Sequence, residues 1–343
     1  MKIAFNLIQC GLGNNGGSQS IIRMAMALSE LGNEVKILLD SPNKFTWFGG
    51  FENLLHLVNK KNKDSWPKYD VIIATGCKTV NSTLEYPNID INNKFYWIRG
   101  HETWGMSEED LFKNYKSGLN LLVNSEWLRE MIFRKCEVIS KIQYPGYVDG
   151  MHIAKAHGFV DEINIGALYY ADKESKMFNQ IINIAFLLKE NKIINKLILF
   201  GNKQMDDNFK RDLNDLFGIP YEFSYRPTYD EKMALMNKCD IWLSTSELEG
   251  LHIPPIEAGL NGCNLVTKGL YSSGTSDYAI DGLTAKIFFT AEEALQRILE
   301  YVNDPKEMNI HSTNLRYILY YKIGSVQNNA LKFQKILEQS LEK

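Results

Sequence analysis

The first half of the chain alternates short apolar runs with segments of helical periodicity. Residues 2–8 form a β-rich apolar run, a glycine-rich loop follows, and residues 20–33 carry apolar side chains at helical spacing up to Gly32, which is expected to end that helix. Further strands are predicted at 34–39, 70–75, 94–100 and 119–125. Strands that alternate with helices predict a parallel sheet with helices on both faces.

The pattern weakens between residues 146 and 162 and then restarts. Strands are predicted at 163–170, 196–201, 240–246, 264–269 and 284–289, and helices at 175–191, 230–239, 254–263 and from there to the end. The sequence therefore predicts two Rossmann-like α/β domains, residues 1–160 and 161–315, and a C-terminal helix in 316–343 that packs back towards the first domain. A cleft between two such parallel sheets is the expected ligand site.

Length, charge and cysteine content narrow the class of protein. A chain of 343 residues suits two domains, and a net charge of −3 gives no electrostatic reason to expect nucleic acid as a partner. No apolar stretch reaches the roughly 18 residues that span a bilayer, and the N-terminus lacks a signal-peptide pattern. The five cysteines are scattered without CxxC spacing, which favours reduced thiols in a cytoplasmic protein and argues against structural zinc.

A glycine-rich loop, GLGNNGG, follows the first predicted strand and opens a helix, a position that favours anion binding. From Gly11 it formally reads G-x-G-x-x-G, and Asp40 after the second strand has the place of a ribose-binding acid. This half of the chain is therefore also compatible with a nicotinamide-dependent oxidoreductase. It is equally compatible with a loop that is rich in glycine only because its backbone must be flexible.

The segment SELEGLHIPPIEAG contains two glutamates around a turn from a strand into a helix. Glu249 follows the carboxyl end of an apolar strand, where ligands bind in open α/β folds, and Gly250 lets the backbone approach closely. Pro254 and Pro255 suit the first turn of a helix, and Glu257 is expected in that same turn.

Between the two glutamates, the backbone amides from Leu251 to Ile253 are placed to bind a phosphate. Carboxylates are poor partners for phosphate, but one carboxylate can accept two hydrogen bonds from a vicinal diol. The combination indicates a site for a sugar, a diphosphate and a ribose.

The same segment carries a family resemblance. EGLHIPPIEAGLNGCNLV is similar to the E-G-F-G-L-P-x-x-E-A-x-A-x-G-x-P-V motif of the retaining GT-B glycosyltransferases of glycosyltransferase family 4 (glycosyl transferases group 1). NNGGSQSIIRMAMALSELGNEVKIL, LLVNSEWLREMI and YPGYVDGM resemble further segments of that family, so the resemblance covers nearly the whole chain. It implies a GT-B fold, two Rossmann-like domains with parallel sheets facing across a cleft.

The resemblance implies roles for several residues. Glu257 would bind the ribose hydroxyls of a nucleotide sugar, and Glu249 would contact the donor sugar near the reacting centre. Gly16 and Gly17 would approach the donor's phosphate and sugar from the N-terminal domain. His101 matches a histidine that lines the donor sugar, although a histidine after a strand is also a common structural residue.

His252 occupies a position where the family usually has glycine, so it either faces the sugar or caps the loop. The sequence departs from the family pattern at a position that binds the diphosphate in the family, because Ala167 stands where arginine is common. Lys173 fits the family spacing and Lys176 sits better at the helix start, and the choice between them stays open. Arg226 lies where the family has a loop near the nucleotide base, and it either contacts the nucleotide or lies on the surface.

The implied activity is transfer of a hexose-type sugar from a UDP- or GDP-sugar, with retention of anomeric configuration, to a hydroxyl of a glycan or lipid-linked glycan. No cofactor and no metal are expected, since no D-x-D motif is present and the nucleotide sugar is a substrate. An inactive nucleotide-sugar-binding protein is a further alternative, although such a protein could lose Glu249. Residues 46–66 combine aromatic residues with lysines and are expected to form a helix, either interfacial, giving peripheral contact with the inner face of the membrane, or packed on the sheet.

Overall fold

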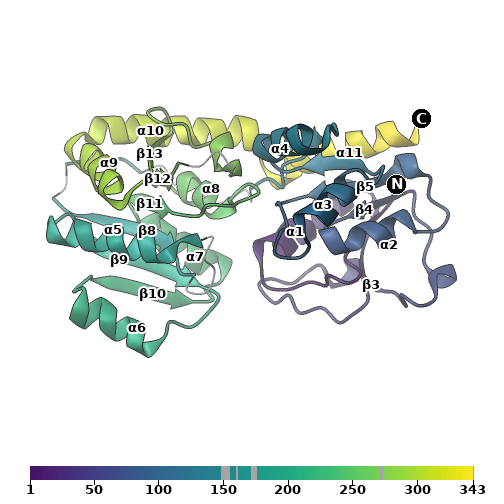
Figure 1. Ribbon diagram of the computed structural model, residues 1–343, viewed down its shortest axis with the longest axis horizontal. Helices are drawn as coiled ribbons and strands as arrows, with labels where there is room; N and C mark the ends of the chain where they lie inside the picture. Colours follow the sequence, from purple (N-terminus) through teal and green to yellow (C-terminus); the bar gives the residue numbers. More distant parts are fainter. Residues whose placement is uncertain (148–154, 160, 171–175, 270–272, 343) are drawn as a thin grey trace. The chain divides into compact units, whose positions relative to one another are not determined.

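A computed structural model describes residues 1–147, 155–159, 161–170, 176–269 and 273–342. The chain forms two compact units (Figure 1). Unit 1 contains residues 1–148 and 324–343, and unit 2 contains residues 149–323. The sequence prediction placed the corresponding boundaries at residues 160 and 315, and it gave the C-terminal helix a segment of its own.

Unit 1 is built on a parallel sheet of seven strands in the order β3-β2-β1-β4-β5-β6-β7. Its strands are β1 (Lys2–Asn6), β2 (Glu34–Leu39), β3 (Leu55–Leu57), β4 (Val71–Ala74), β5 (Lys94–Ile98), β6 (Asn120–Val123) and β7 (Lys141–Ile142). Its helices are α1 (Gly16–Glu30), α2 (Val80–Leu84), α3 (Glu108–Tyr115), α4 (Glu126–Cys136) and α11 (Val326–Leu341). The strand order reverses between β1 and β4, which in open α/β sheets marks the ligand-binding edge.

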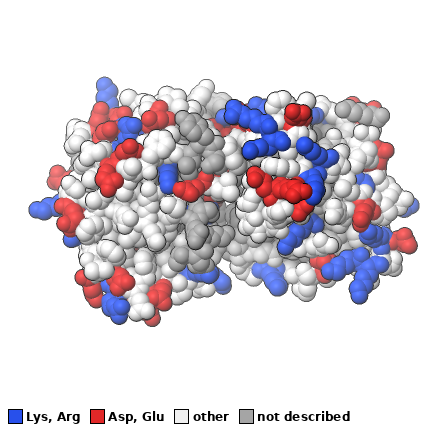
Figure 2. Space-filling model, in the orientation of Figure 1, with Lys and Arg blue, Asp and Glu red and all other residues white. Residues whose placement is uncertain are grey.

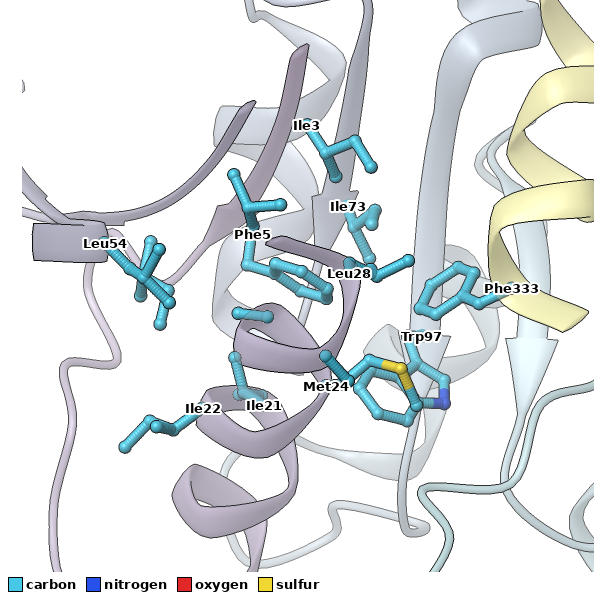
Figure 3. Packing of buried hydrophobic residues seen from close by; sticks show 14 of the residues in the cluster. Ile3, Phe5, Ile21, Ile22, Met24, Leu28, Leu54, Ile73, Trp97 and Phe333 are labelled. Atoms are coloured by element: carbon cyan, nitrogen blue, oxygen red, sulfur yellow. The ribbon is translucent and has the colours of Figure 1, made fainter. Parts of the chain in front are cut away.

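The core of unit 1 lies between the sheet and helices α1 and α11 (Figure 3). Phe5 of β1 and Trp97 of β5 are fully buried, and Phe333 of α11 packs against both rings with centroid distances of 6.2 and 5.6 Å. The last helix of the chain is therefore part of the core formed by the first strands.

Unit 2 repeats the architecture with six parallel strands in the order β10-β9-β8-β11-β12-β13. Its strands are β8 (Ile163–Leu168), β9 (Ile194–Gly201), β10 (Tyr221–Tyr225), β11 (Ile241–Ser244), β12 (Asn264–Lys268) and β13 (Ala285–Phe288). Its helices are α5 (Phe178–Glu190), α6 (Asp207–Arg211), α7 (Tyr229–Lys238), α8 (Ile253–Leu260), α9 (Ala291–Asn303) and α10 (Pro305–Ile318), and π-helical turns continue α6 over Asp212–Leu216 and α10 over Leu319–Ile323. The two parallel sheets confirm the predicted α/β class.

One predicted element is wrong. Residues 46–66 do not form a helix, interfacial or packed. They contain two short 3₁₀ turns, Glu52–Leu54 and Lys63–Ser65, and the edge strand β3. Trp47 and Phe48 pack against the core through the Phe45 ring, which lies 5.6 and 4.9 Å from their rings, so the aromatic residues of this segment belong to unit 1 rather than to a surface helix.

All five cysteines are free thiols, as the sequence indicates. Within the described part of the chain, we find no helix with the length and apolar character needed to cross a bilayer.

Candidate functional site

In unit 2 the strand order reverses between β8 and β11, and the loops that leave these two strands bring Lys176 and Glu249 together. The Lys176 ammonium forms an ion pair with Oε1 of Glu249, and the two side chains are only 16% and 15% exposed. Lys176 precedes α5 and Glu249 follows β11, so 73 residues separate the partners along the chain. The predicted site therefore coincides with the switch point of the sheet, the usual ligand position in such folds.

The backbone of Glu249 is held by Gly274, whose N–H donates to the Glu249 carbonyl at 3.0 Å. Burial alone would raise the pKa of the Glu249 carboxyl, but electrostatic contact with His252 and Lys176, together with hydrogen bonds from Lys176 and Ser246, lowers it below its usual value. The carboxylate is therefore ionised at neutral pH.

His252 lies beside this ion pair. Its Nε2 is 3.6 Å from Oε1 of Glu249, and its Nδ1 is 3.3 Å from the hydroxyls of both Ser244 and Thr275. The hydroxyl of Tyr278 donates to the His252 carbonyl at 2.7 Å. The side chain makes no cap hydrogen bond to α8, although His252 is the N-cap residue.

Burial lowers the pKa of His252 to about 4, so its imidazole is neutral at neutral pH and Lys176 is the cation beside Glu249. The backbone of His252 is left-handed, with φ of 63°, the region that glycine adopts without strain. A small cavity of about 10 Å³, roughly the volume of one water, is lined by Lys176, Ser244 and His252 among others.

The lowered pKa of His252 predicts loss of stability in acid. The unfolded chain has an ordinary histidine pKa near 6.5, so it binds this proton before the folded chain as the pH falls from 6.5 to about 4. We expect this group to lower the free energy of unfolding by about 2 kcal/mol between pH 7 and pH 4.5. Asparagine tolerates positive φ, so we use the His252→Asn variant as the comparison. Its free energy of unfolding, measured by urea titration at the two pH values, should fall less than that of the natural chain. Equal losses in both proteins would contradict the assignment.

Glu257 lies in α8, but one residue beyond its first turn, which corrects the prediction that placed it within that turn. Pro254 and Pro255 occupy the first turn and have no N–H, so the amides at this helix start are those of Leu251, His252 and Ile253. Gly250 and Leu251 form the turn from β11 to α8, and Leu251 is buried.

A cation that the sequence analysis missed contacts Glu257. Nζ of Lys232 in α7 lies 2.6 Å from Oε1 of Glu257, and the side chains are 17% and 8% exposed. The two residues are on separate helices that pack together, so no spacing along the chain pointed to this contact.

In unit 1, Gly16 and Gly17 form the first turn of α1, and Oδ1 of Asn15 accepts a hydrogen bond from Ser18 N at 2.8 Å. The Arg99 guanidinium donates to the carbonyls of Gly17 and Thr75, and so joins the first turn of α1 to the segments that follow β4 and β5. Burial lowers the pKa of Arg99. Arg99 directly follows an apolar strand, and this position in the sequence could have identified it as a candidate site residue.

His101 lies two residues after Arg99 and is buried. Its Nδ1 is 3.2 Å from the Tyr115 hydroxyl, its Nε2 is 3.4 Å from Oε1 of Glu108, and its ring stacks on Phe112. These contacts fix the orientation of the imidazole at the same sheet edge as the glycine loop.

Lys173, Arg226 and Asp40 complete the residues that the sequence singled out. Lys173 lies outside the described residues. Arg226 is exposed, donates to the Asn202 carbonyl at 3.2 Å and lies over the Tyr225 ring. Asp40, the acid that a dinucleotide site would need, accepts a hydrogen bond from Gln9 N and pairs with Lys60 at 3.3 Å.

Comparisons with known proteins agree that the chain is similar to glycosyltransferases. The family model described as "Glycosyl transferases group 1" matches residues 154–316. The structure of HepE of Anabaena with UDP and glucose is 15% identical with a TM-score of 0.75, and the match covers 99% of this chain and 100% of that one. Sucrose-phosphate synthase of Thermosynechococcus elongatus is 13% identical with a TM-score of 0.73, and 98% of each chain is covered.

TarM of S. aureus, in a complex with Fondaparinux, alpha-GlcNAc-glycerol and UDP, is 17% identical with a TM-score of 0.62, and the match covers 78% of this chain. The chain spans 55% of the length of that TarM structure. No curated protein sequence matches the chain significantly. The family match falls on unit 2, the unit that holds Lys176, Glu249 and Glu257, so unit 2 is a group 1 glycosyltransferase domain, and the fold of the chain is that of the GT-B glycosyltransferases.

Proposed function

We propose that the chain transfers a sugar from a UDP-sugar to a hydroxyl acceptor with retention of anomeric configuration. The observation that carries the proposal is the buried Lys176–Glu249 ion pair at the switch point of unit 2. The bound UDP in HepE and in TarM favours a uridine donor over a guanosine donor.

The ion pair suggests how donor binding begins. A donor diphosphate carries more negative charge than one carboxylate and competes with Glu249 for the Lys176 ammonium. Lys176 then stabilises the charge that develops on the leaving diphosphate, and the released Glu249 accepts hydrogen bonds from the sugar hydroxyls.

Other residues have supporting roles in this proposal. The backbone amides of Leu251, His252 and Ile253 hold phosphate oxygens, and the neutral imidazole of His252 contacts the sugar. Glu257 binds the ribose hydroxyls.

The remaining assignments follow the family resemblance. In unit 1, the amides of Gly16 and Gly17 and the imidazole of His101 contact the phosphate and the sugar of the donor. The proposed acceptor is a glycan or a lipid-linked glycan. The chain needs no dissociable cofactor for this reaction, because the leaving group is stabilised by protein cations and amides.

The test is nucleotide release from a panel of UDP- and GDP-sugars, with and without glycan acceptors, together with donor-dependent thermal shifts. Release of UDP that depends on the sugar supports the transferase. Binding of a donor without any release would favour an inactive nucleotide-sugar-binding protein. A thermal shift with a nicotinamide dinucleotide and none with any nucleotide sugar would favour the oxidoreductase.

A surface at the end of α4 favours peripheral contact with an anionic membrane. Phe133 and Ile139 are 55% and 82% exposed, and Lys135 and Lys141, each two residues further along the chain, are also exposed, as is the acidic residue Glu137 between them. Figure 2 shows blue side chains gathered over α4. Exposed apolar residues among lysines suit the headgroup region of an anionic bilayer.

We expect the Lys135→Glu/Lys141→Glu variant to lose most of its binding to vesicles that contain anionic lipid, since each lysine near the surface contributes about 1 kcal/mol. Co-sedimentation with phosphatidylglycerol vesicles measures the loss. A Lys189→Glu/Lys192→Glu variant in unit 2 has the same change in charge and should bind as the natural chain does. Equal binding by all three proteins would remove this surface from the proposal.

A further inference from the structure

Lys232 lies on α7 and directs its ammonium to α8, where Nζ is 2.6 Å from Oε1 of Glu257. The ammonium also lies 5.1 Å from the centroid of the Tyr229 ring, one helical turn earlier on α7. Both charged side chains are largely buried, with exposed fractions of 17% for Lys232 and 8% for Glu257. The contact is therefore an ordered ion pair rather than a flexible surface pair.

A buried ion pair gives little net stability, because desolvation of two charges offsets much of their attraction. Buried charged pairs are instead well suited to fixing the position of a group, since each partner restricts the other. The Lys232 contact involves one oxygen of Glu257, and among the described residues no hydrogen bond reaches the other oxygen, Oε2. The lysine thus holds the carboxylate by one side and leaves the second oxygen as an acceptor.

We infer that Lys232 is a positioning residue that orients Glu257 to read both hydroxyls of the donor ribose. This inference rests on the proposed function, in which Glu257 binds the ribose. A vicinal diol donates one hydrogen bond to each carboxylate oxygen when both oxygens point towards it, and Oε1 can accept from a ribose hydroxyl through its second lone pair while it pairs with Lys232. With Oε1 held by Lys232, loss of one ribose hydroxyl leaves a desolvated acceptor without its donor, so the site rejects 2′-deoxyribonucleotides.

The chain provides a matched control on the same helix. Lys238 of α7 pairs with Glu222 at the same 2.6 Å distance, but its side chain is 52% exposed and its partner is in β10. Lys238→Met removes one lysine and one ion pair from α7 without touching Glu257.

The experiment measures dissociation constants for UDP and 2′-deoxy-UDP by calorimetry, in the natural chain and in four variants, Lys232→Met, Lys232→Gln, Lys232→Arg and Lys238→Met. The natural chain should prefer UDP by about tenfold or more, which corresponds to about 1.4 kcal/mol. Lys232→Met and Lys232→Gln should reduce the preference to about twofold, because Glu257 no longer has a fixed orientation. Lys232→Arg and Lys238→Met should keep the preference of the natural chain.

A purely structural role of Lys232 would lower affinity for both nucleotides equally and leave their ratio unchanged, and that result overturns the inference. An unchanged ratio in Lys232→Gln overturns it in the same way if Lys232→Met does not fold. A natural chain that binds UDP without preference over 2′-deoxy-UDP also overturns the inference, while the proposed function stands. If the natural chain binds no nucleotide and no nucleotide sugar, the proposed function fails and the inference fails with it.

Discussion

Replacement of Glu249 by glutamine is expected to lower kcat of sugar transfer by about 100- to 1000-fold, the loss typical when one electrostatic group of a preorganised site is removed. Glutamine keeps the shape of the side chain but removes the negative charge that pairs with Lys176. In the proposed mechanism, transfer passes through a sugar with positive character, which a carboxylate at this position would stabilise and an amide would not. The dissociation constant of UDP should not rise, because UDP lacks the sugar that Glu249 is proposed to contact and its diphosphate no longer competes with Glu249 for Lys176.

Glu247 supplies the matched control for this experiment. It lies two residues before Glu249 and pairs with Lys268 at 2.8 Å, but its side chain is 41% exposed. Glu247→Gln should keep turnover within about twofold of the natural chain, since exposed ion pairs contribute little. If Glu249→Gln and Glu247→Gln have the same turnover, the carboxylate at 249 has no part in the chemistry.

Replacement of Phe333 by alanine is expected to destabilise unit 1 by about 3–5 kcal/mol, the usual cost of removing a buried aromatic ring. The ring is fully buried between Phe5 and Trp97, so the cavity cannot be filled by water or by an exposed side chain. Hydrogen exchange of backbone amides in β1 and β5 measures the loss, and amides in β8 and β11 of unit 2 give an internal reference.

Phe133→Ala removes the same side chain from the exposed face of α4, and it should change exchange in unit 1 by about 0.5 kcal/mol or less. Faster exchange in both units of Phe333→Ala would show that the two units unfold together. Unchanged exchange in β1 and β5 would show that α11 is not required by the core of unit 1.

The sequence predicted the regular elements of the fold well where burial on two faces gives a continuous apolar run. Residues 34–39 were expected as a strand and form β2 with the same bounds, and the strand expected at 240–246 contains β11. The prediction for 46–66 failed because a combination of aromatic residues and lysines does not by itself specify a helix, and the aromatic rings pack on one another in a loop. The conformation of residues 46–66 is therefore set by tertiary packing rather than by the local sequence pattern.

The candidate site was predictable in part for a similar reason. Glu249 and Glu257 stand in one continuous segment with a turn and two prolines, so residue spacing alone could single them out. Lys232 contacts Glu257 from another helix, and Arg99 joins the first turn of α1 to the segments after β4 and β5. Such contacts depend on the strand order of a sheet, which the spacing of residues along a chain does not reveal.

The return of the chain to unit 1 at residue 324 has a consequence for synthesis on the ribosome. Unit 2 is continuous in sequence and has all its residues once synthesis passes residue 323, whereas unit 1 must wait for α11 although its strands emerge first. Translation that stops before α11 would therefore leave the first-made part of the protein incomplete and the later-made part whole. A truncation near residue 330 would therefore destabilise unit 1, which contains the glycine-rich loop, rather than unit 2, which contains Glu249 and Glu257.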